Sequence, residues 1–312
     1  MAASFALAAQ LDAGSRAPNA RRELATAADL FSKAKVHAVR PGDVVTAFPH
    51  AFYPESAWQD DVALAGAELA LAGRALRDGR AAGWLREGLH WSSVYRRDVH
   101  DKDTLNLYDV STLADTELVR ASRLLRAGDT GPLLTDLRAR LRAAATRSSA
   151  DPFRAAVHYD DFDAASHAFG LVATEELYRQ LTGDGSLAGL ATAQRDWNLG
   201  ANPWGASLMI GVGTTFPRCP QHVVANLSGS LDGRAPVLRG AIVNGPNDAE
   251  NFEGGLGGLL AGMRRCPPHG GDAFRPYSAR GSRYVDDVRA WQTVEPAIDF
   301  TATAALAFAM SS

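Results

Sequence analysis

From the N-terminus to about Gly200, apolar residues recur at helical spacing, with short polar breaks between the repeats. Turn-forming Gly, Pro and Asp residues mark several of the breaks, as in Arg40–Asp43 and Thr182–Ser186. The pattern predicts helices over residues 4–11, 19–37, 57–77, 81–95, 110–127, 130–146, 164–182 and 186–199. This part of the chain is therefore predicted to be all-α.

The segment from Gly205 to Val288 has little periodicity and is rich in Gly, Pro, Asn and Asp. Long irregular segments inside a compact domain are usually functional, so we expect these residues to form the loops of a site carried by the helices. The Gly- and Pro-rich stretch 254–271 is expected to be a mobile insertion. A final apolar helix is predicted at about 293–310. No linker is evident, so we treat residues 1–312 as one domain.

Composition excludes several classes of partner. The hydrophobic content of 46% is ample for a packed core, and the net charge of −3 gives no signature of polyanion binding. We therefore expect no nucleic-acid partner. No apolar run reaches the length of a membrane span, and Met1–Leu11 lacks the basic region of a signal peptide. A membrane partner is not expected either.

The chain contains two cysteines, Cys219 and Cys266, each followed by a proline. A disulfide between them would close a long loop and stabilise the fold by about 4 kcal/mol in the chain-entropy model. Two inert thiols are the alternative. The sequence leaves both interpretations open.

Three carboxylates, Asp286, Asp287 and Glu295, lie just before and at the start of the last predicted helix. We expect Glu295 in the first turn of that helix, because Pro296 follows it and proline is tolerated at helix starts. The helix dipole would stabilise the Glu295 anion, so a working acid would need apolar or like-charged surroundings to raise its pKa. Asp286 and Asp287 are predicted to supply the like charge. The alternative is a capping cluster on a surface helix.

The spacing of Tyr284-x-Asp286-x4-Trp291-x3-Glu295-x-Ala297 resembles the C-terminal active-site signature of glycoside hydrolase family 9, the inverting endoglucanase family. In that family the Glu is the general acid that protonates the leaving glycosidic oxygen. The resemblance therefore implies that Glu295 is the acid and that Asp286 supports and positions it.

Other segments resemble blocks of the same family in the same order. They are Tyr53-Pro-Glu-Ser-Ala-Trp-Gln-Asp-Asp61, Asn106-Leu-Tyr-Asp-Val110, Leu199-Gly-Ala-Asn-Pro-Trp-Gly205 and Gly240-Ala-Ile-Val-Asn-Gly-Pro-Asn247. Five matches in order identify the chain as a member of the family, over about residue 20 to the C-terminus.

The resemblance implies an all-α (α/α)6 toroid, with an inner and an outer ring of helices and long active-site loops before the last helix. The periodicity predicts about nine helices, fewer than this fold has, so we expect a catalytic domain truncated at its N-terminus. The lost helices would leave apolar faces that associate. The family's catalytic base lies in an Asp-Ala-Gly-Asp segment, whereas here Ser15 follows Asp12-Ala13-Gly14. Our hypothesis is that the chain alone hydrolyses nothing efficiently.

Pro220-Gln-His-Val223 departs from the family's Pro-His-His-Arg, whose first His and Arg contact sugar hydroxyls. Gln221 can still bond a hydroxyl, and His222 keeps the second His. Val223 cannot replace the charged donor, so a hydrogen bond to the sugar that contributes about 1.5–3 kcal/mol of binding free energy is lost. We therefore predict that Gln221 and His222 bind substrate, and these departures leave the exact glycan open.

Aromatic rings stack on the apolar faces of sugars, so Tyr108, Trp204 and Trp291 are predicted to bind substrate, with core packing as the alternative. We predict no cofactor and no metal ligands. The resemblance implies structural calcium as an alternative, at the oxygen-rich Asn247–Asn251 and at Asp286-Asp287. The acidic stretch His158–His167 is expected to cap a helix rather than bind a metal.

The expected activity is hydrolysis of β-1,4-linked glucan, with a β-glycan polysaccharide or oligosaccharide as partner. A catalytically inactive carbohydrate-binding remnant of the same fold is one alternative. A related β-glycan or glucosaminide hydrolase, acting on chitosan for instance, is another. The family is mostly extracellular, yet no export signal is visible in this chain.

Overall fold

The computed structural model describes residues 1–40, 43–44, 57–99, 104–229, 238–260, 262–279 and 281–311. The start of the Tyr53–Asp61 block, residues 53–56, lies outside the described residues. The chain divides into two compact units, one of residues 1–139 and 180–183, the other of residues 140–179 and 184–312. The prediction of one catalytic domain stays a prediction.

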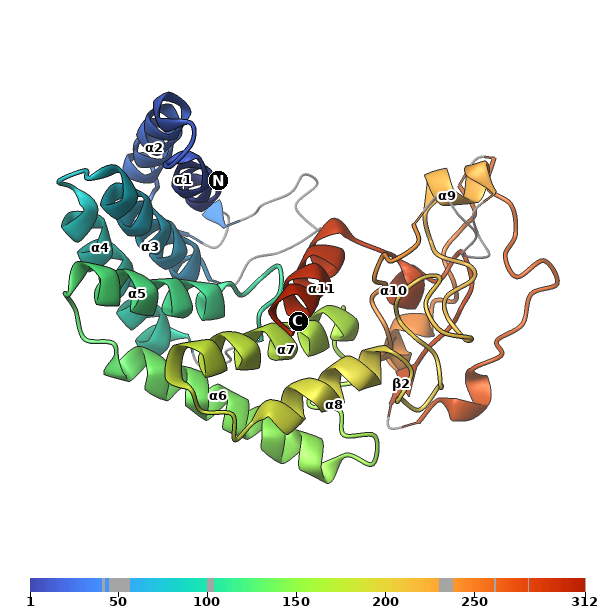
Figure 1. Ribbon diagram of the computed structural model, residues 1–312. Helices are drawn as coiled ribbons and strands as arrows, with labels where there is room; N and C mark the ends of the chain where they lie inside the picture. Colours follow the sequence, from blue (N-terminus) through green and yellow to red (C-terminus); the bar gives the residue numbers. More distant parts are fainter. Residues whose placement is uncertain are drawn as a thin grey trace. The chain divides into compact units, whose positions relative to one another are not determined.

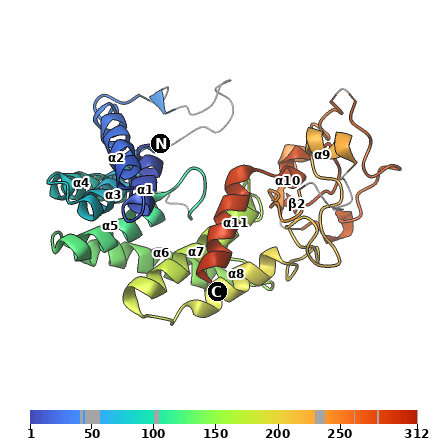
Figure 2. The same cartoon turned by 45° about the horizontal axis from the view of Figure 1, so that its top comes forward.

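Unit 1 is helical (Figure 1). Its helices are α1 (Ala2–Asp12), α2 (Ala17–Ser32), α3 (Gln59–Leu76), α4 (Ala81–Asp98) and α5 (Ser111–Leu125), and α6 (Gly131–Ala150) begins in it. Helix α3 is central and contacts α1, α2, α4 and α5, an arrangement seen from a second side in Figure 2.

Small residues allow this close packing in unit 1. A Cβ atom on Gly66 of α3 would approach the Cα of Gly88 in α4 to 2.8 Å, so the two helices touch through their glycines. The core around this contact consists of alanines, leucines, Val119 and Trp84, all buried. Helix α3 ends at Leu76. Its C-cap, Arg77, has a left-handed backbone (φ 57°), and the N–H of Asp78 donates to the carbonyl of Gly73 at 2.7 Å.

Unit 2 combines helices with long loops. Its elements after α6 are α7 (Ala164–Thr182), α8 (Ala188–Asn198), α9 (Val223–Ser228), β1 (Asn247–Asp248), two 3₁₀ turns (Ala249–Phe252 and Arg275–Tyr277), β2 (Ser282–Arg283), α10 (Trp291–Val294) and α11 (Ile298–Met310). Strands β1 and β2 pair antiparallel. Helix α7 is buried along almost its whole length, and Phe169 packs on Phe308 of α11 with ring centroids 5.4 Å apart.

A short extended segment brings the loops of unit 2 to the residues that precede α11. The N–H of Asn244 donates to the carbonyl of Glu295 at 3.2 Å, and that of Gly245 donates to the carbonyl of Thr293 at 3.2 Å. The carbonyl of Asn244 accepts from the N–H of Ala165 at the start of α7, at 2.9 Å. Residues around 244 therefore join α7 to the segment that carries Glu295.

The predicted helices agree with the observed ones up to α8 to within about one turn at each end, with one exception. The helix predicted over residues 19–37 ends at Ser32, so residues 33–37 are not helical as predicted. The prediction of one helix over 293–310 is wrong. Helix α10 ends at Val294, an extended segment follows, and α11 begins at Ile298. The short α9 was not predicted, since six residues carry too little periodicity.

Candidate active site

Glu295 lies in the extended segment between α10 and α11, with φ −75° and ψ 120°. The prediction that it occupies the first turn of the last helix is therefore wrong. The physical reason is Pro296, because the residue before a proline is disfavoured in the helical region and adopts an extended backbone. The carboxyl group is consequently outside the first turn of α11.

Burial raises the pKa of the Glu295 carboxyl above its usual range. Of the two causes that the sequence left open, apolar surroundings and the like charges of Asp286 and Asp287, the structure supports the first, because desolvation raises this pKa. A carboxyl group with a raised pKa keeps its proton to higher pH, which is what a general acid requires.

The carboxylate of Asp286 holds the loop that precedes Gln221. Its two oxygens accept hydrogen bonds from the backbone N–H groups of Arg218 and Cys219, both at 2.8 Å. Burial raises the pKa of Asp286 to about 6, although these bonds act in the opposite direction. These bonds go to the loop rather than to the Glu295 carboxyl, so the structure ties Asp286 to the residues that lead to Gln221.

Gln221 and His222 follow directly and lie beside the Glu295 segment. The N–H of Gln221 donates to the carbonyl of Val294 at 2.9 Å. His222 is the N-cap of α9, where its Nδ1 accepts from the N–H of Ala225 at 3.1 Å. In the neutral imidazole this places the proton on Nε2, which makes that atom a donor. Both side chains are partly exposed.

Trp291 begins α10, and its exposed ring stacks on the exposed ring of Phe162 with centroids 6.0 Å apart and an interplanar angle of 12°. Gly257 lies against the same indole, since a Cβ atom there would come within 3.4 Å of it. The structure therefore brings Phe162, from the loop before α7, to the helix that precedes Glu295.

Trp204 and Tyr108 lie in different settings. Trp204 is buried between Tyr284 and Tyr159, with ring centroids 5.8 and 5.9 Å away. Tyr108 belongs to unit 1, in a turn where its N–H donates to the Oδ1 of Asn106 at 2.6 Å. Trp204 is thus in the same unit as Glu295, and Tyr108 is in the other.

Cys219 and Cys266 form a disulfide, with Cα atoms 5.3 Å apart. Cys266 also accepts, through its carbonyl, a hydrogen bond from the N–H of Val288 at 2.9 Å. The disulfide thus joins the loop before Gln221 to the irregular segment that faces Asp286. It resolves the alternative that the sequence had left open.

Asn244 was missed as a candidate. Its side chain is 6% exposed, and its Oδ1 is buried without a hydrogen-bond partner among the described residues. Its backbone bonds to Glu295 and Ala165 place it beside the candidate acid. The signal available in the sequence was its position inside the Gly240–Asn247 block.

Among the described residues, no cluster of His, Cys, Asp and Glu could hold a metal ion. The oxygens considered for calcium cap local turns: Oδ1 of Asn247 accepts from Asp248 N–H and Asn251 Nδ2, both at 2.7 Å, and Oδ1 of Asp248 accepts from Glu250 N–H at 2.8 Å. Over the same described part of the chain, no helix combines the length and apolar character needed to cross a membrane.

Comparison with known proteins places this chain in a family. A sequence model described as Glycosyl hydrolase family 9 matches residues 1–308, and the chain belongs to this family. Endoglucanase 14 of Arabidopsis thaliana is 36% identical over 85 residues, which cover 21% of this chain and 17% of that protein. Endoglucanase 21 of Oryza sativa subsp. japonica is 40% identical over 90 residues, covering 23% of this chain and 17% of that protein.

Solved structures show the fold. The chain resembles GH family 9 endoglucanase J30 with a TM-score of 0.70 and 24% identity, covering 99% of this chain and 54% of that one. It also resembles AaCel9A, solved in complex with cellobiose-like isofagomine, with a TM-score of 0.68 and 18% identity, covering 100% of this chain and 54% of that one. The mostly helical fold is thus that of the family's (α/α)6 toroid, as predicted, and the chain spans about half the length of these structures.

Proposed function

We propose that the protein acts in the hydrolysis of β-1,4-glycosidic bonds of glucan, with inversion and with Glu295 as the general acid. The observation that carries this proposal is the partly buried Glu295 carboxyl, whose pKa is raised by desolvation in a loop-built site. A proton held on this carboxyl would pass to the glycosidic oxygen as the bond to the leaving sugar breaks.

The neighbouring residues take supporting roles in this proposal. The Nε2–H of His222 and the amide of Gln221 would bond sugar hydroxyls, and the exposed indole of Trp291 would stack on a sugar face. Asp286 would act as a positioning residue, because its bonds hold the loop that leads to Gln221. The roles of Trp204 and Tyr108 as substrate contacts remain predictions from the sequence.

An inverting enzyme also needs a carboxylate that activates water, about 6.5–9.5 Å from the acid. The residue nearest to the family's pattern is Asp12, but Ser15 stands at the second Asp position, and Asp12 ends α1, with an ion pair to Arg16 at 3.9 Å. We therefore propose that the base is an Asp this sequence lacks, and that the chain alone turns over poorly.

The second candidate is sugar binding without hydrolysis. It is favoured by Ser15 and by Val223, which stand where the family has an Asp and a charged sugar contact, while the candidate sugar-binding residues Gln221, His222 and Trp291 are present. The two candidates share these residues and differ in whether bonds break.

The test is reducing-end release from a soluble β-1,4-glucan and from chitosan, by the chain, by Glu295→Gln and by a matched control, Glu253→Gln, at an exposed position. Release abolished by Glu295→Gln but not by Glu253→Gln supports Glu295 as the acid and refutes the absence of a base. Preference for chitosan would identify a glucosaminide hydrolase. Glucan binding with no release in any protein agrees both with the second candidate and with a hydrolase that lacks its base. Equal release by Glu295→Gln overturns the assignment of the acid.

A further inference from the structure

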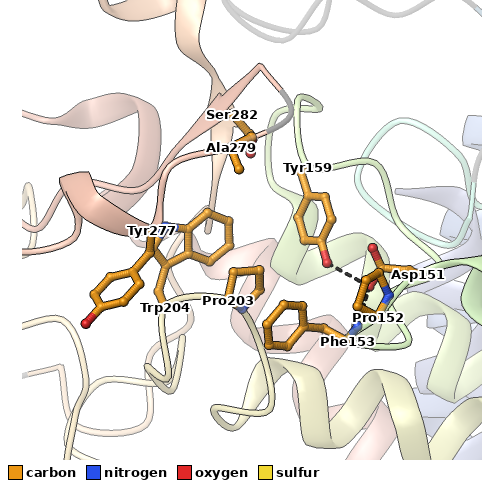
Figure 3. A pocket seen from close by; sticks show the side chains of 9 residues that line it. All are labelled: Asp151, Pro152, Phe153, Tyr159, Pro203, Trp204, Tyr277, Ala279 and Ser282. Carbon is orange, nitrogen blue, oxygen red and sulfur yellow. Dashed lines mark hydrogen bonds between the residues drawn. The ribbon is translucent and has the colours of Figure 1, made fainter.

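Unit 2 contains a cavity whose lining includes none of the candidate catalytic residues. It has a volume of about 260 Å³, and its wall is mainly aromatic and proline rings. Figure 3 shows Tyr277 on one side, Phe153 and Tyr159 on the other, and Pro203 and Trp204 between them. Pockets for drug-sized ligands measure about 300–1,000 Å³, so this cavity suits a single small ring.

The rings of this cavity differ in exposure. Trp204 is 5% exposed and forms a buried wall, whereas Phe153 and Tyr277 are 42% and 55% exposed at the rim. Phe153 and Tyr277 therefore leave their rings open at the rim, where a bound molecule would contact them. Aromatic faces and edges around a ring-sized hollow match the apolar faces of a pyranose.

The turn that presents Phe153 is built rigidly. Oδ1 of Asp151 accepts from the N–H of Phe153 at 2.8 Å, from the N–H of Ala155 at 3.2 Å and from the hydroxyl of Tyr159 at 2.9 Å. Arg154 has a left-handed backbone with φ 60°, and its carbonyl accepts from the side chain of Gln194 at 2.8 Å. A non-glycine residue held in this conformation indicates a turn constrained by its surroundings, as at many binding sites.

A second hollow of about 420 Å³ adjoins the first, with Pro152 and Phe153 in both walls. Its lining also includes the charged residues Arg154 and Asp196, which can bond the hydroxyl groups of a sugar. Phe153 therefore separates an aromatic hollow from a polar one, and the two together have room for two linked rings.

We propose that these two hollows form an accessory binding site for a β-linked disaccharide unit of the glycan, with one pyranose in the aromatic hollow and the next beside Arg154. This inference rests on the proposed function, because it takes the ligand from that proposal. The site would hold the polysaccharide by residues that take no part in bond cleavage.

The test is titration of the full chain with glucose and cellobiose, followed by calorimetry and by the indole N–H signal of Trp204, which Trp204→Phe identifies. Cellobiose should shift this signal and bind more tightly than glucose. Phe153→Ala and Tyr277→Ala should each weaken the binding of cellobiose about 3- to 10-fold, as expected for the loss of one aromatic contact. Phe5→Ala, at an exposed phenylalanine of unit 1, is the matched control and should change nothing.

Arg154→Gly keeps the left-handed backbone and removes the side chain. It should therefore weaken the binding of cellobiose and leave the binding of glucose unchanged. An unshifted Trp204 signal, or equal binding by Phe153→Ala and Phe5→Ala, overturns the accessory site. The accessory site is also overturned if the chain self-associates and Phe153→Ala abolishes this self-association. Binding that depends on Trp291 alone overturns it too but leaves the proposed sugar contacts near Glu295 standing. Glucan release that Glu295→Gln leaves unchanged, with the Trp204 response intact, refutes the proposed acid and not this site.

Discussion

Asp286→Asn should reduce the pH dependence of stability, because Asp286 is the partly buried carboxyl that holds the loop before Gln221. The substitution keeps the shape of the side chain and removes its titration. The pKa of Asp286 is about 6 in the folded protein, against about 3.9 for an unperturbed Asp. Between these values the folded chain binds a proton that the unfolded chain has released.

The direction of the pH effect follows from the linkage between proton binding and folding. The folded-state pKa is raised, so this group's contribution to the free energy of unfolding grows as the pH falls through about 6 and is lost as the pH rises through it. Between about pH 7 and about pH 4.5 the contribution is about 2 kcal/mol. The wild-type chain should gain this amount on acidification relative to Asp286→Asn.

The assay is urea unfolding, followed by tryptophan fluorescence at both pH values, for the wild type, Asp286→Asn and the exposed control Asp160→Asn. The reasoning is refuted if the wild type and Asp286→Asn differ by the same free energy at both pH values. A difference that changes with Asp160→Asn as well would point to net charge rather than to the buried site.

Three further outcomes test other parts of the structure. Gly66→Ala should destabilise unit 1 by roughly 1–3 kcal/mol, because its Cβ atom would meet the backbone of α4. Gly79→Ala is the control and should leave the stability unchanged, because no atom lies within 4 Å of its Cβ position. Thermal melting compares the two variants. Replacing Cys219 and Cys266 by alanine should lower the free energy of unfolding by up to about 4 kcal/mol. The melting temperature of the double variant should not change when a reductant is added. Trp291→Ala should weaken binding of cello-oligosaccharides about 3- to 10-fold by calorimetry; unchanged affinity would place the sugar elsewhere.

The helices up to α8 could be predicted because their signal is repeated many times. Helix α7 spans Ala164–Thr182, and the apolar spacing of the sequence predicts 164–182. Breaks such as the one after Leu125 coincide with a left-handed residue, Arg126, which the sequence does not mark with glycine. The end of that helix was therefore predicted only to within a few residues.

The loops of unit 2 could not be predicted in the same way, because contacts between distant residues determine them. The bonds from Asp286 to Arg218 and Cys219 join positions 68 and 67 residues apart in the chain. The stacking of Phe162 on Trp291 and the position of Asn244 beside Glu295 are of the same kind. The family signature gave the candidate residues, and only the structure shows which of them share a unit.

The error at Glu295 is the instructive one, because a rule within reach of the sequence would have prevented it. Proline is favoured at the first position of a helix, and that preference led to a helix containing Glu295. The same proline disfavours a helical backbone at the residue before it, and the observed extended conformation follows this second rule. The difference matters for chemistry. Within the first turn, the helix dipole would have lowered the pKa of the carboxyl; outside it, burial raises the pKa. Pro296→Ala would relax the restraint on the backbone of Glu295, and a helix extended back to this residue should lower the pKa of its carboxyl, measured by NMR titration of the side-chain carbon.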